Sequence, residues 1–178
     1  MGTVTVRDAR DDERGAIAAL TLGAYGEYAT LMAPAAWTGL EQAVRAALAS
    51  DEGAERIVAV DGDALLGSVM LFPAAADAYG GLTGGATCPE VRLLAVAPEA
   101  RGRGIGQLLV DECVRRAQRA GATELGLHTS RSMRSAMRLY ERMGFVRVPE
   151  RDFQPEGAEL VEGYRLVLAG HPATEAER

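Results

Sequence analysis

Short runs of apolar residues with two different spacings predict a chain that alternates between strands and amphipathic helices. In seven runs, apolar residues either alternate with polar ones or fill both faces, as they do in β-strands. These predicted strands lie at residues 3–7, 56–60, 65–72, 91–97, 125–129, 145–148 and 160–168. A hairpin turn at Asp61-Gly62-Asp63 is expected to join the second and third of them.

Four other stretches space their apolar residues three and four positions apart, which is typical of an amphipathic α-helix. These helices follow the acids at 11–13, begin at Ala35 after a break near Pro34, cover 104–120, and present Met133, Ala136, Met137 and Tyr140 on one face. The first is predicted to run through Tyr28. Gly121 and Gly144 are expected to end the third and fourth helices.

In chain order these elements read β-α-α-β-β-β-α-β-α-β-β, an α/β fold of the α+β type with helices on a mixed, mainly antiparallel sheet. The sheet is expected to turn parallel around the strand-helix-strand unit at 91–129. One domain is predicted over 1–170, followed by a polar tail at 171–178. The segment 74–87, rich in alanine and glycine, is interpreted either as a flap over a site or as an exposed connection.

The composition agrees with a compact domain and excludes several mechanisms. Of the 178 residues, 48% are hydrophobic and 25% charged, which is typical of a folded globular chain and not of a disordered or fibrous one. All 19 basic residues are arginine. A chain without lysine cannot form a lysine Schiff base, use lysine as a general base or bind phosphate through a Walker A lysine.

Charge is unevenly distributed along the chain. The net charge is −6, but residues 92–147 contain 11 arginines against five acids and carry +6, so the rest carries −12. We therefore expect an anionic ligand in the second half of the chain. Cys88 and Cys113 fit neither a disulfide framework nor a zinc spacing, and no metal is expected. Without a signal-peptide core or an apolar run near ~20 residues, a cytoplasmic location with no membrane contact is expected.

One segment combines glycine and arginine in a way that favours anion binding. Arg101-Gly102-Arg103-Gly104-Ile105-Gly106 lies between a central strand and the start of a helix. Glycine lets backbone N–H groups approach a ligand closely, and a helix N-terminus offers unpaired donors and a positive dipole end, so a diphosphate fits. The segment lacks the third glycine of a dinucleotide fingerprint and the lysine of Walker A. A tight turn whose glycines serve packing alone remains the alternative.

This segment, within LLAVAPEARGRGIG, resembles the acetyl-CoA motif of the GNAT superfamily of N-acetyltransferases, which reads Arg or Gln, two residues, Gly, one residue, Gly or Ala. A second stretch, Ala136-x-x-Leu139-Tyr140-Glu141-x-x-Gly144-Phe145, resembles the downstream segment of that family. The resemblance is specific over about 88–148. It implies a sheet of about seven strands flanked by about four helices, and acetyl-CoA as the acyl donor.

The resemblance also assigns residues to the cofactor. Backbone amides of 101–106 would hold the CoA pyrophosphate, and Arg101 and Arg103 would add positive charge. Backbone groups of the segment Leu94-Ala95-Val96 would pair with the pantetheine arm like an added strand. Where many members have an asparagine that contacts this arm, the chain has Met133, and Ser130 or Ser132 is the expected substitute.

Acetyl transfer to an amine calls for a base and an acid. An ammonium has no lone pair, so the amine must lose a proton, and the departing thiolate is stabilised by gaining one. Tyr140 matches the general acid of the family, although a core aromatic is the alternative. Glu90 is the preferred base, directly or through water, unless it is merely an exposed residue at a strand end. His128, on the adjacent strand, is a second candidate for the base, and both cysteines are expected to be inert.

The acceptor is expected to be a primary amine, either a small cationic amine or a peptide N-terminus, acetylated directly in a ternary complex. Residues expected to frame it are Tyr25, Tyr28, Met32, Trp37, Asp77, Tyr79 and the segment 153–162. They belong to the portion that carries −12, so an acidic rim is predicted to attract cations. A non-catalytic acyl-CoA sensor or partner module is the alternative. Nucleic-acid binding is not expected, and a homodimer is left open.

Overall fold

The computed structural model describes residues 3–50, 53–74 and 86–169. The expected tail and most of the segment 74–87 lie outside these described residues. The strands are β1 (Val4–Asp8), β2 (Glu55–Asp61), β3 (Ala64–Phe72), β4 (Glu90–Val96), β5 (Glu124–Ser130), β6 (Val146–Arg147) and β7 (Val161–Val167). The α-helices are α1 (Arg14–Gly26), α2 (Pro34–Ala49), α3 (Ile105–Arg119) and α4 (Arg134–Arg142).

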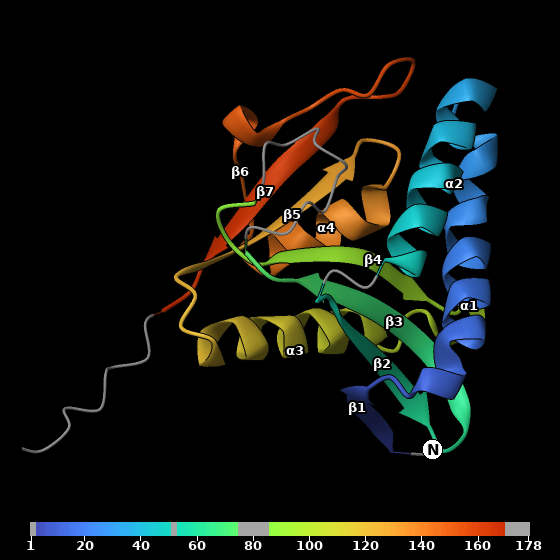
Figure 1. Ribbon diagram of the computed structural model, residues 1–178, viewed down its shortest axis with the longest axis vertical. Coiled ribbons are helices and arrows are strands. Elements are labelled where there is room, and N and C mark those ends of the chain that lie inside the picture. Colours follow the sequence, from blue (N-terminus) through green and yellow to red (C-terminus); the bar gives the residue numbers. More distant parts are fainter. Residues whose placement is uncertain (1–2, 51–52, 75–85, 170–178) are drawn as a thin grey trace, which may run out of the picture.

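All seven strands form one sheet in the order β1-β2-β3-β4-β5-β7-β6 (Figure 1). Every neighbouring pair is antiparallel except β4 and β5, which flank α3 in the sequence and run parallel. The predicted mainly antiparallel sheet, with its parallel step around 91–129, is therefore confirmed. The predicted hairpin is also confirmed, because Asp61 pairs with Ala64 across a two-residue turn that begins with Gly62 at φ 59°.

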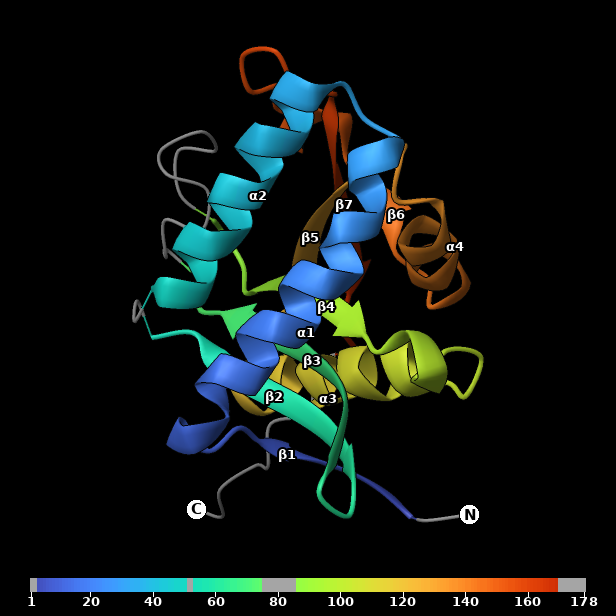
Figure 2. The ribbon, with the colours of Figure 1, turned by 90° about the vertical axis from the view of Figure 1, so that its right-hand side faces the viewer.

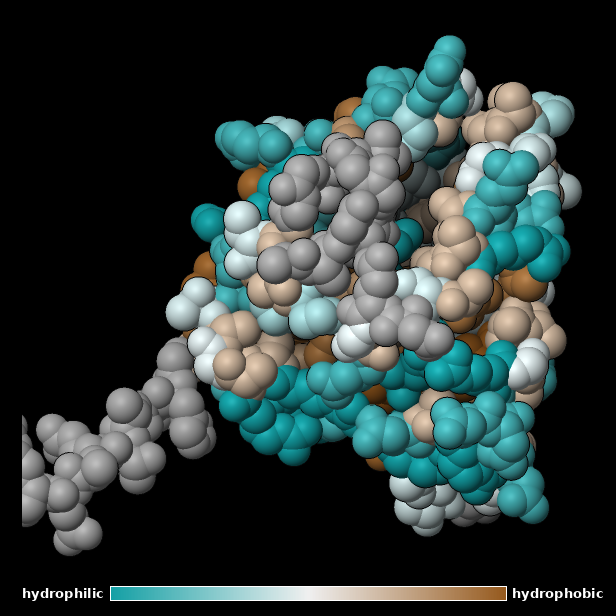
Figure 3. Space-filling view, in the orientation of Figure 1, coloured by the Kyte–Doolittle hydropathy of each residue, from teal (hydrophilic) through white to brown (hydrophobic). Residues whose placement is uncertain are grey.

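Helices cover both faces of the sheet. Figure 2 shows α1 and α2 in front of the strands and α3 behind them. Behind the sheet, α3 and α4 bury a large cluster that includes Leu109, Leu127 and Tyr140, while in front α2 packs Val44 against Phe72. The outer surface over α3 is hydrophilic (Figure 3), as its amphipathic sequence requires. The face of the sheet that carries α1 and α2 is called the α1–α2 face below.

Most element boundaries differ from the predicted ones by one or two residues. The first helix ends at Gly26, and Tyr28 lies in a 3-10 turn at Glu27–Thr30, which is a common way for an α-helix to end. Helix α2 begins one residue earlier than predicted, at Pro34, because proline lacks an N–H that the first helical position would leave unpaired. Strand β6 has only the two residues Val146–Arg147 instead of the predicted 145–148.

Strands β4 and β5 separate after a short stretch of pairing. Within the described residues they pair only at Glu90–Gly126 and Val91–Leu127, and Figure 1 shows them diverging beyond that point. Opposite β3, the register of β4 shifts between Arg92 and Ala95, where Leu93 has a φ of 53°. A left-handed leucine costs roughly 1–2 kcal/mol, so the surrounding packing must hold this bulge in place. The bulge redirects β4 and leaves an opening beside it.

Close packing of β3 on α3 requires a glycine at position 67. A Cβ there would lie 2.8 Å from the carbonyl oxygen of Ala95 and 3.1 Å from side-chain atoms of Ile105 and Leu109. We expect Gly67→Ala to lower the free energy of unfolding by about 1–3 kcal/mol, because the strand must move away from the helix. Gly39→Ala on α2, where a Cβ meets nothing within 4 Å, is the control and should stabilise by roughly 0.5–1 kcal/mol. Urea unfolding measures both, and an unchanged midpoint for Gly67→Ala contradicts this packing.

Candidate functional site

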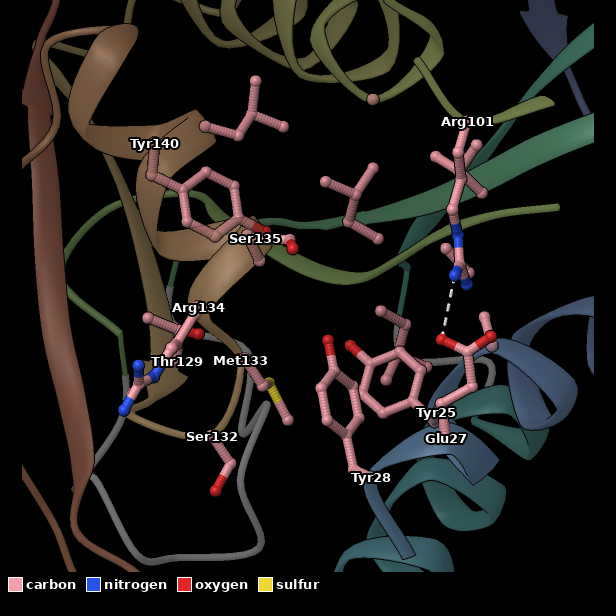
Figure 4. A pocket seen from close by; sticks show the side chains of 18 of the residues that line it. Tyr25, Glu27, Tyr28, Arg101, Thr129, Ser132, Met133, Arg134, Ser135 and Tyr140 are labelled. Atoms are coloured by element: carbon pink, nitrogen blue, oxygen red, sulfur yellow. Dashed lines mark ion pairs between the residues drawn. The ribbon is translucent and has the colours of Figure 1, made fainter. Parts of the chain in front are cut away.

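A cavity of about 1080 Å³ opens where β4 and β5 diverge. Its walls come from the end of α1 and the following 3-10 turn, from β4 and β5, and from the N-terminal residues of α3 and α4. Figure 4 shows side chains from these separate elements pointing toward a common space. The divergence of two parallel strands therefore creates a concave site whose size admits an extended ligand.

The glycine-rich segment 101–106 forms one end of this cavity. Gly102 and Gly104 have φ values of 73° and 76°, a left-handed conformation that other residues rarely adopt. Gly104 is the N-cap of α3, and the first helical N–H bonded to its carbonyl oxygen belongs to Leu108. The amides of residues 105–107 thus precede the first helical hydrogen bond and are available to an anion. The geometry agrees with the anion cradle expected from the sequence.

The two arginines of this segment differ in position. Arg101 lines the cavity, and its Nη1 lies 2.9 Å from Oε2 of Glu27 in the 3-10 turn, across the cavity mouth (Figure 4). Arg103 is not among the lining residues, and its guanidinium lies 3.6 Å from the carboxylate of Asp61. The side chain of Arg103 turns toward the β2–β3 hairpin, and the contribution of both arginines to diphosphate binding stays a prediction.

The three residues predicted to follow the pantetheine arm do line the cavity. Leu94, Ala95 and Val96 form its wall on β4, downstream of the bulge. On one edge β4 pairs with β3, where Ala95 is opposite Ser68. On its other edge, within the described residues, the ladder to β5 stops at Val91. The backbone of β4 beyond Val91 can therefore accept an added, strand-like ligand.

A second helix N-terminus, which the sequence reasoning did not consider, faces the same cavity. Met133 is the N-cap of α4, and Arg134 and Ser135 in its first turn line the cavity (Figure 4). Of the two expected serine substitutes, Ser132 lines the cavity and donates a hydrogen bond to Glu159. Ser130 is 5% exposed and does not line the cavity, so Ser132 is the better placed of the two.

Tyr140 is a buried side chain that also lines the cavity. It is 6% exposed, and its ring packs edge-on against Phe145 with centroids 5.7 Å apart. The same side chain lines the cavity and points from α4 into the open space that Tyr25 and Tyr28 face from the other side (Figure 4). The two alternatives weighed for Tyr140 are thus compatible, because the ring belongs to the core while its hydroxyl end reaches the cavity.

Glu90 and His128 form a buried pair on adjacent strands. Glu90 is 4% exposed, and its Oε1 lies 3.6 Å from Nδ1 of His128. Nε2 of His128 lies 2.9 Å from the carbonyl oxygen of Arg151, which can only accept, so Nε2 donates. His128 lines the cavity whereas Glu90 does not. The alternative of an exposed glutamate at a strand end is therefore wrong. Glu90 does not line the cavity itself but contacts His128, which does.

The α1–α2 side of the cavity carries aromatic and charged groups. Tyr25 and Tyr28 both line it and contact each other edge-on with ring centroids 5.9 Å apart. Burial raises the pKa of both phenols, so they remain protonated donors at neutral pH. Met32 and Trp37, which were expected to frame the same space, do not line it.

Charged side chains of both signs line the described part of the cavity. Among the described lining residues, the arginines are Arg92, Arg101, Arg131, Arg134 and Arg142, and the acids are Glu27 and Glu159. All five arginines belong to the stretch 92–147, which carries +6, and both acids belong to the portion that carries −12. The acidic rim stays a prediction, although Glu27 is paired with Arg101 and Glu159 accepts a hydrogen bond from Ser132. Asp77 and Tyr79, also named for the rim, lie outside the described residues.

Neither cysteine is a nucleophile in this environment. Burial raises the pKa of Cys88 to about 11 and that of Cys113 to about 12, so both thiols stay protonated near neutral pH. Within the ranges 3–50, 53–74 and 86–169, no group of three or more His, Cys, Asp or Glu side chains is placed to hold a metal ion. In the same ranges, no helix is long and apolar enough to cross a membrane.

Comparison with known proteins identifies a family. Residues 23–145 match the model of the acetyltransferase (GNAT) family. A segment of 113 residues is 33% identical to mycothiol acetyltransferase from Geodermatophilus obscurus, which corresponds to 62% of this chain and 35% of that protein. Another segment of 62 residues is 39% identical to an uncharacterized N-acetyltransferase of Schizosaccharomyces pombe, of which it covers 38%. The chain thus spans little more than a third of these curated relatives.

Solved structures share the fold over nearly the whole chain. An acetyltransferase of the GNAT family from Streptococcus agalactiae superposes with a TM-score of 0.68, 13% identity, and coverage of 92% of this chain and 95% of that one. The protein yncA from Salmonella typhimurium, solved with its cofactor acetyl-CoA, superposes with a TM-score of 0.60, 19% identity, and coverage of 98% and 99%. At these identities the likeness concerns the fold.

Proposed function

This chain belongs to the GNAT family of acetyltransferases, and we propose that it is an acyltransferase that uses acetyl-CoA and transfers the acetyl group to a primary amine in a direct, ternary-complex reaction. The observation that carries the proposal is the cavity itself. It joins an anion cradle, an unpaired strand edge and a tyrosine hydroxyl in one continuous space. Acetyl-CoA supplies an activated thioester and an anionic diphosphate.

In this proposal the backbone amides of 102–106 bind the diphosphate of the donor. The left-handed glycines at 102 and 104 leave no Cβ between these amides and the ligand, and the α3 dipole adds attraction for the anion. Arg101 supplies a mobile positive charge at the same end. The edge of Leu94 to Val96 pairs with the arm that leads to the thioester, which directs the reacting carbon toward Tyr140.

We assign the proton-accepting role to the Glu90–His128 pair. With Nε2 donating to a backbone carbonyl, the basic lone pair of a neutral His128 lies on Nδ1, on the side of Glu90. The amine passes its proton to this pair through water, because Nδ1 of His128 is buried against Glu90, and the Glu90 carboxylate stabilises the imidazolium that forms. The amine nitrogen then bonds to the thioester carbon as the carbon–sulfur bond breaks. Tyr140 gives its proton to the departing thiolate.

Direct transfer is favoured over an acetyl-cysteine route because both thiols are buried and protonated. The sequence analysis predicts a small cationic amine or a peptide N-terminus as the acceptor. The proposal includes both as primary amines. A cytoplasmic location and a homodimer stay predictions.

The proposal is tested by incubating the protein with acetyl-CoA and a panel of amines. We expect N-acetylated amine, detected by mass spectrometry, and free CoA thiol in equal amounts, with initial-rate lines that intersect when both substrates are varied. Parallel lines contradict the ternary complex. CoA binding without any amide product contradicts the transfer reaction and favours a binding module.

The Arg101–Glu27 pair predicts an effect on donor affinity. Both side chains are about half exposed, so the pair is worth less than about 1 kcal/mol. Glu27→Gln frees Arg101 for the diphosphate, and we expect the dissociation constant of CoA, measured by calorimetry, to fall about two- to fivefold. Glu41→Gln is the control, because Glu41 pairs with Arg45 on α2 and neither lines the cavity. Weaker CoA binding by Glu27→Gln is the contrary result.

A further inference from the structure

Resting on the proposed function, we propose that the acceptor is an amine that also carries a carboxylate, and that Arg92 binds this carboxylate. Glu90 and Arg92 are two residues apart on β4, so their side chains leave the same face of the strand, with Cα atoms about 7 Å apart. The carboxylate of the proposed Glu90–His128 base and the guanidinium of Arg92 are therefore on the same face of β4. An amino acid presents the opposite pair of charges at a separation of a few bonds.

Contacts place both side chains on the acceptor side. Glu90 is opposite Phe72 in the β3–β4 ladder, and Phe72 belongs to the cluster that packs against α2. The guanidinium of Arg92 lies over the ring of Phe72, 5.5 Å from its centroid. Arg92 thus lies on the α1–α2 face, and it also lines the cavity. The ring of Phe72 is 2% exposed, so it is a fixed platform that orients the guanidinium.

The other cavity-lining arginines lie elsewhere. Arg101 belongs to the anion cradle, and Arg134 and Arg142 belong to α4. Arg131 follows β5, its side chain is 83% exposed, and it pairs with Glu162 at 3.2 Å. Arg92 is therefore the cavity-lining arginine on β4, the strand that also carries Glu90.

Neighbouring groups favour a zwitterion over a polyamine. Tyr25 lies close enough to Arg92 for the guanidinium to oppose the rise in the pKa of its phenol that burial causes. Its hydroxyl faces the cavity as an additional donor to an anion (Figure 4). A second ammonium on the acceptor would meet Arg92 as a like charge, which costs binding energy. An ammonium at the Glu90–His128 pair with a carboxylate at Arg92 satisfies both charges.

The test compares amino acids with their own carboxamides, which keep the amine and remove only the charge of the carboxylate. We expect the wild-type protein to acetylate the amino acids with a kcat/KM about 10- to 100-fold higher, because one charge-assisted contact distinguishes the two series. An α,ω-diamine should be no better than the carboxamides. Arg92→Gln should remove the preference through KM, and Arg92→Lys should retain part of it.

Arg131→Gln is the matched control, since it removes a cavity-lining arginine away from β4 and should keep the full preference. CoA affinity measured for each variant reports whether the cradle has folded, and the wild-type comparison decides even if Arg92→Gln does not fold. Equal or faster acetylation of the carboxamides, or an unchanged preference in Arg92→Gln, overturns the inference while leaving the proposed function intact. No transfer to any member of the panel overturns the proposed function, and this inference with it.

Discussion

Replacing Tyr140 with phenylalanine is expected to lower kcat by about 100-fold or more, with little change in the KM for acetyl-CoA. General acids contribute roughly 10²- to 10⁴-fold, and we expect the lower end because a thiolate, whose parent thiol has an ordinary pKa of ~8.5, is a fairly good leaving group. Phenylalanine keeps the ring against Phe145, so the packing of α4 is retained. Steady-state kinetics with a saturating amine measures the effect.

Tyr164→Phe on β7 is the matched control. Tyr164 is 2% exposed and belongs to the same buried cluster as Tyr140, but it does not line the cavity. Loss of its hydroxyl should leave kcat within the range of the wild type. If Tyr140→Phe also turned over at the wild-type rate, both at neutral and at high pH, Tyr140 would have no role as the acid.

A single methyl group in the glycine-rich segment is expected to weaken donor binding strongly. Gly104 is the N-cap of α3, lines the cavity and has a φ of 76°. Gly104→Ala adds a Cβ at this position. We expect the dissociation constant of CoA to rise about 10- to 100-fold, because charge-assisted hydrogen bonds from the backbone to the diphosphate are lost. Isothermal titration with CoA measures this change.

Gly121→Ala separates this effect from backbone strain. Gly121 has a φ of 77°, almost the same as Gly104, and an added Cβ would meet nothing within 4 Å at either position. Both variants should therefore lose about 1–2 kcal/mol of stability. Gly121 follows the C-terminus of α3, away from the cavity lining, so its CoA affinity should be unchanged. Equal affinities in the two variants would argue against an anion cradle at Gly104.

Most of the fold follows from local patterns in the sequence. Residues close in sequence determine the helix α3, the turn at Gly62 and the central strand β4. The structure has all three elements where they are predicted, to within a residue or two. The bulge at Leu93 could not be predicted in this way. A leucine with a positive φ contradicts its local preference, and its side chain is buried among residues of β3 and α2 that are distant in sequence.

The candidate site was predictable where backbone geometry determines it and less so where long side chains do. The glycines at 102 and 104 adopt the expected conformation, because few other residues can. Arg103 turns to Asp61, a partner on a distant hairpin that no spacing reveals. Arg134 and Ser135 could have been found by applying to α4 the same argument about helix N-termini that was applied to α3.

The acceptor side shows the same limit. Segment totals predict an acidic surface there but not which single side chains line the cavity, and Arg92 of the basic stretch reaches it through the pleat of β4. A net charge per segment carries no information about which side chains share one face. Glu90 was singled out for its chemistry, but its burial behind His128 depends on a pairing between two strands that the sequence does not reveal.

The measurement that tests the central claim most directly is a crystal structure of the protein with CoA bound. The account predicts the diphosphate on the amides of 102–106, the pantetheine arm along Leu94 to Val96, and the sulfur within hydrogen-bonding distance of the Tyr140 hydroxyl. It also predicts an unoccupied space beyond the sulfur, and His128 and Arg92 should face that space. A diphosphate bound elsewhere, or a sulfur directed away from Tyr140, would contradict it.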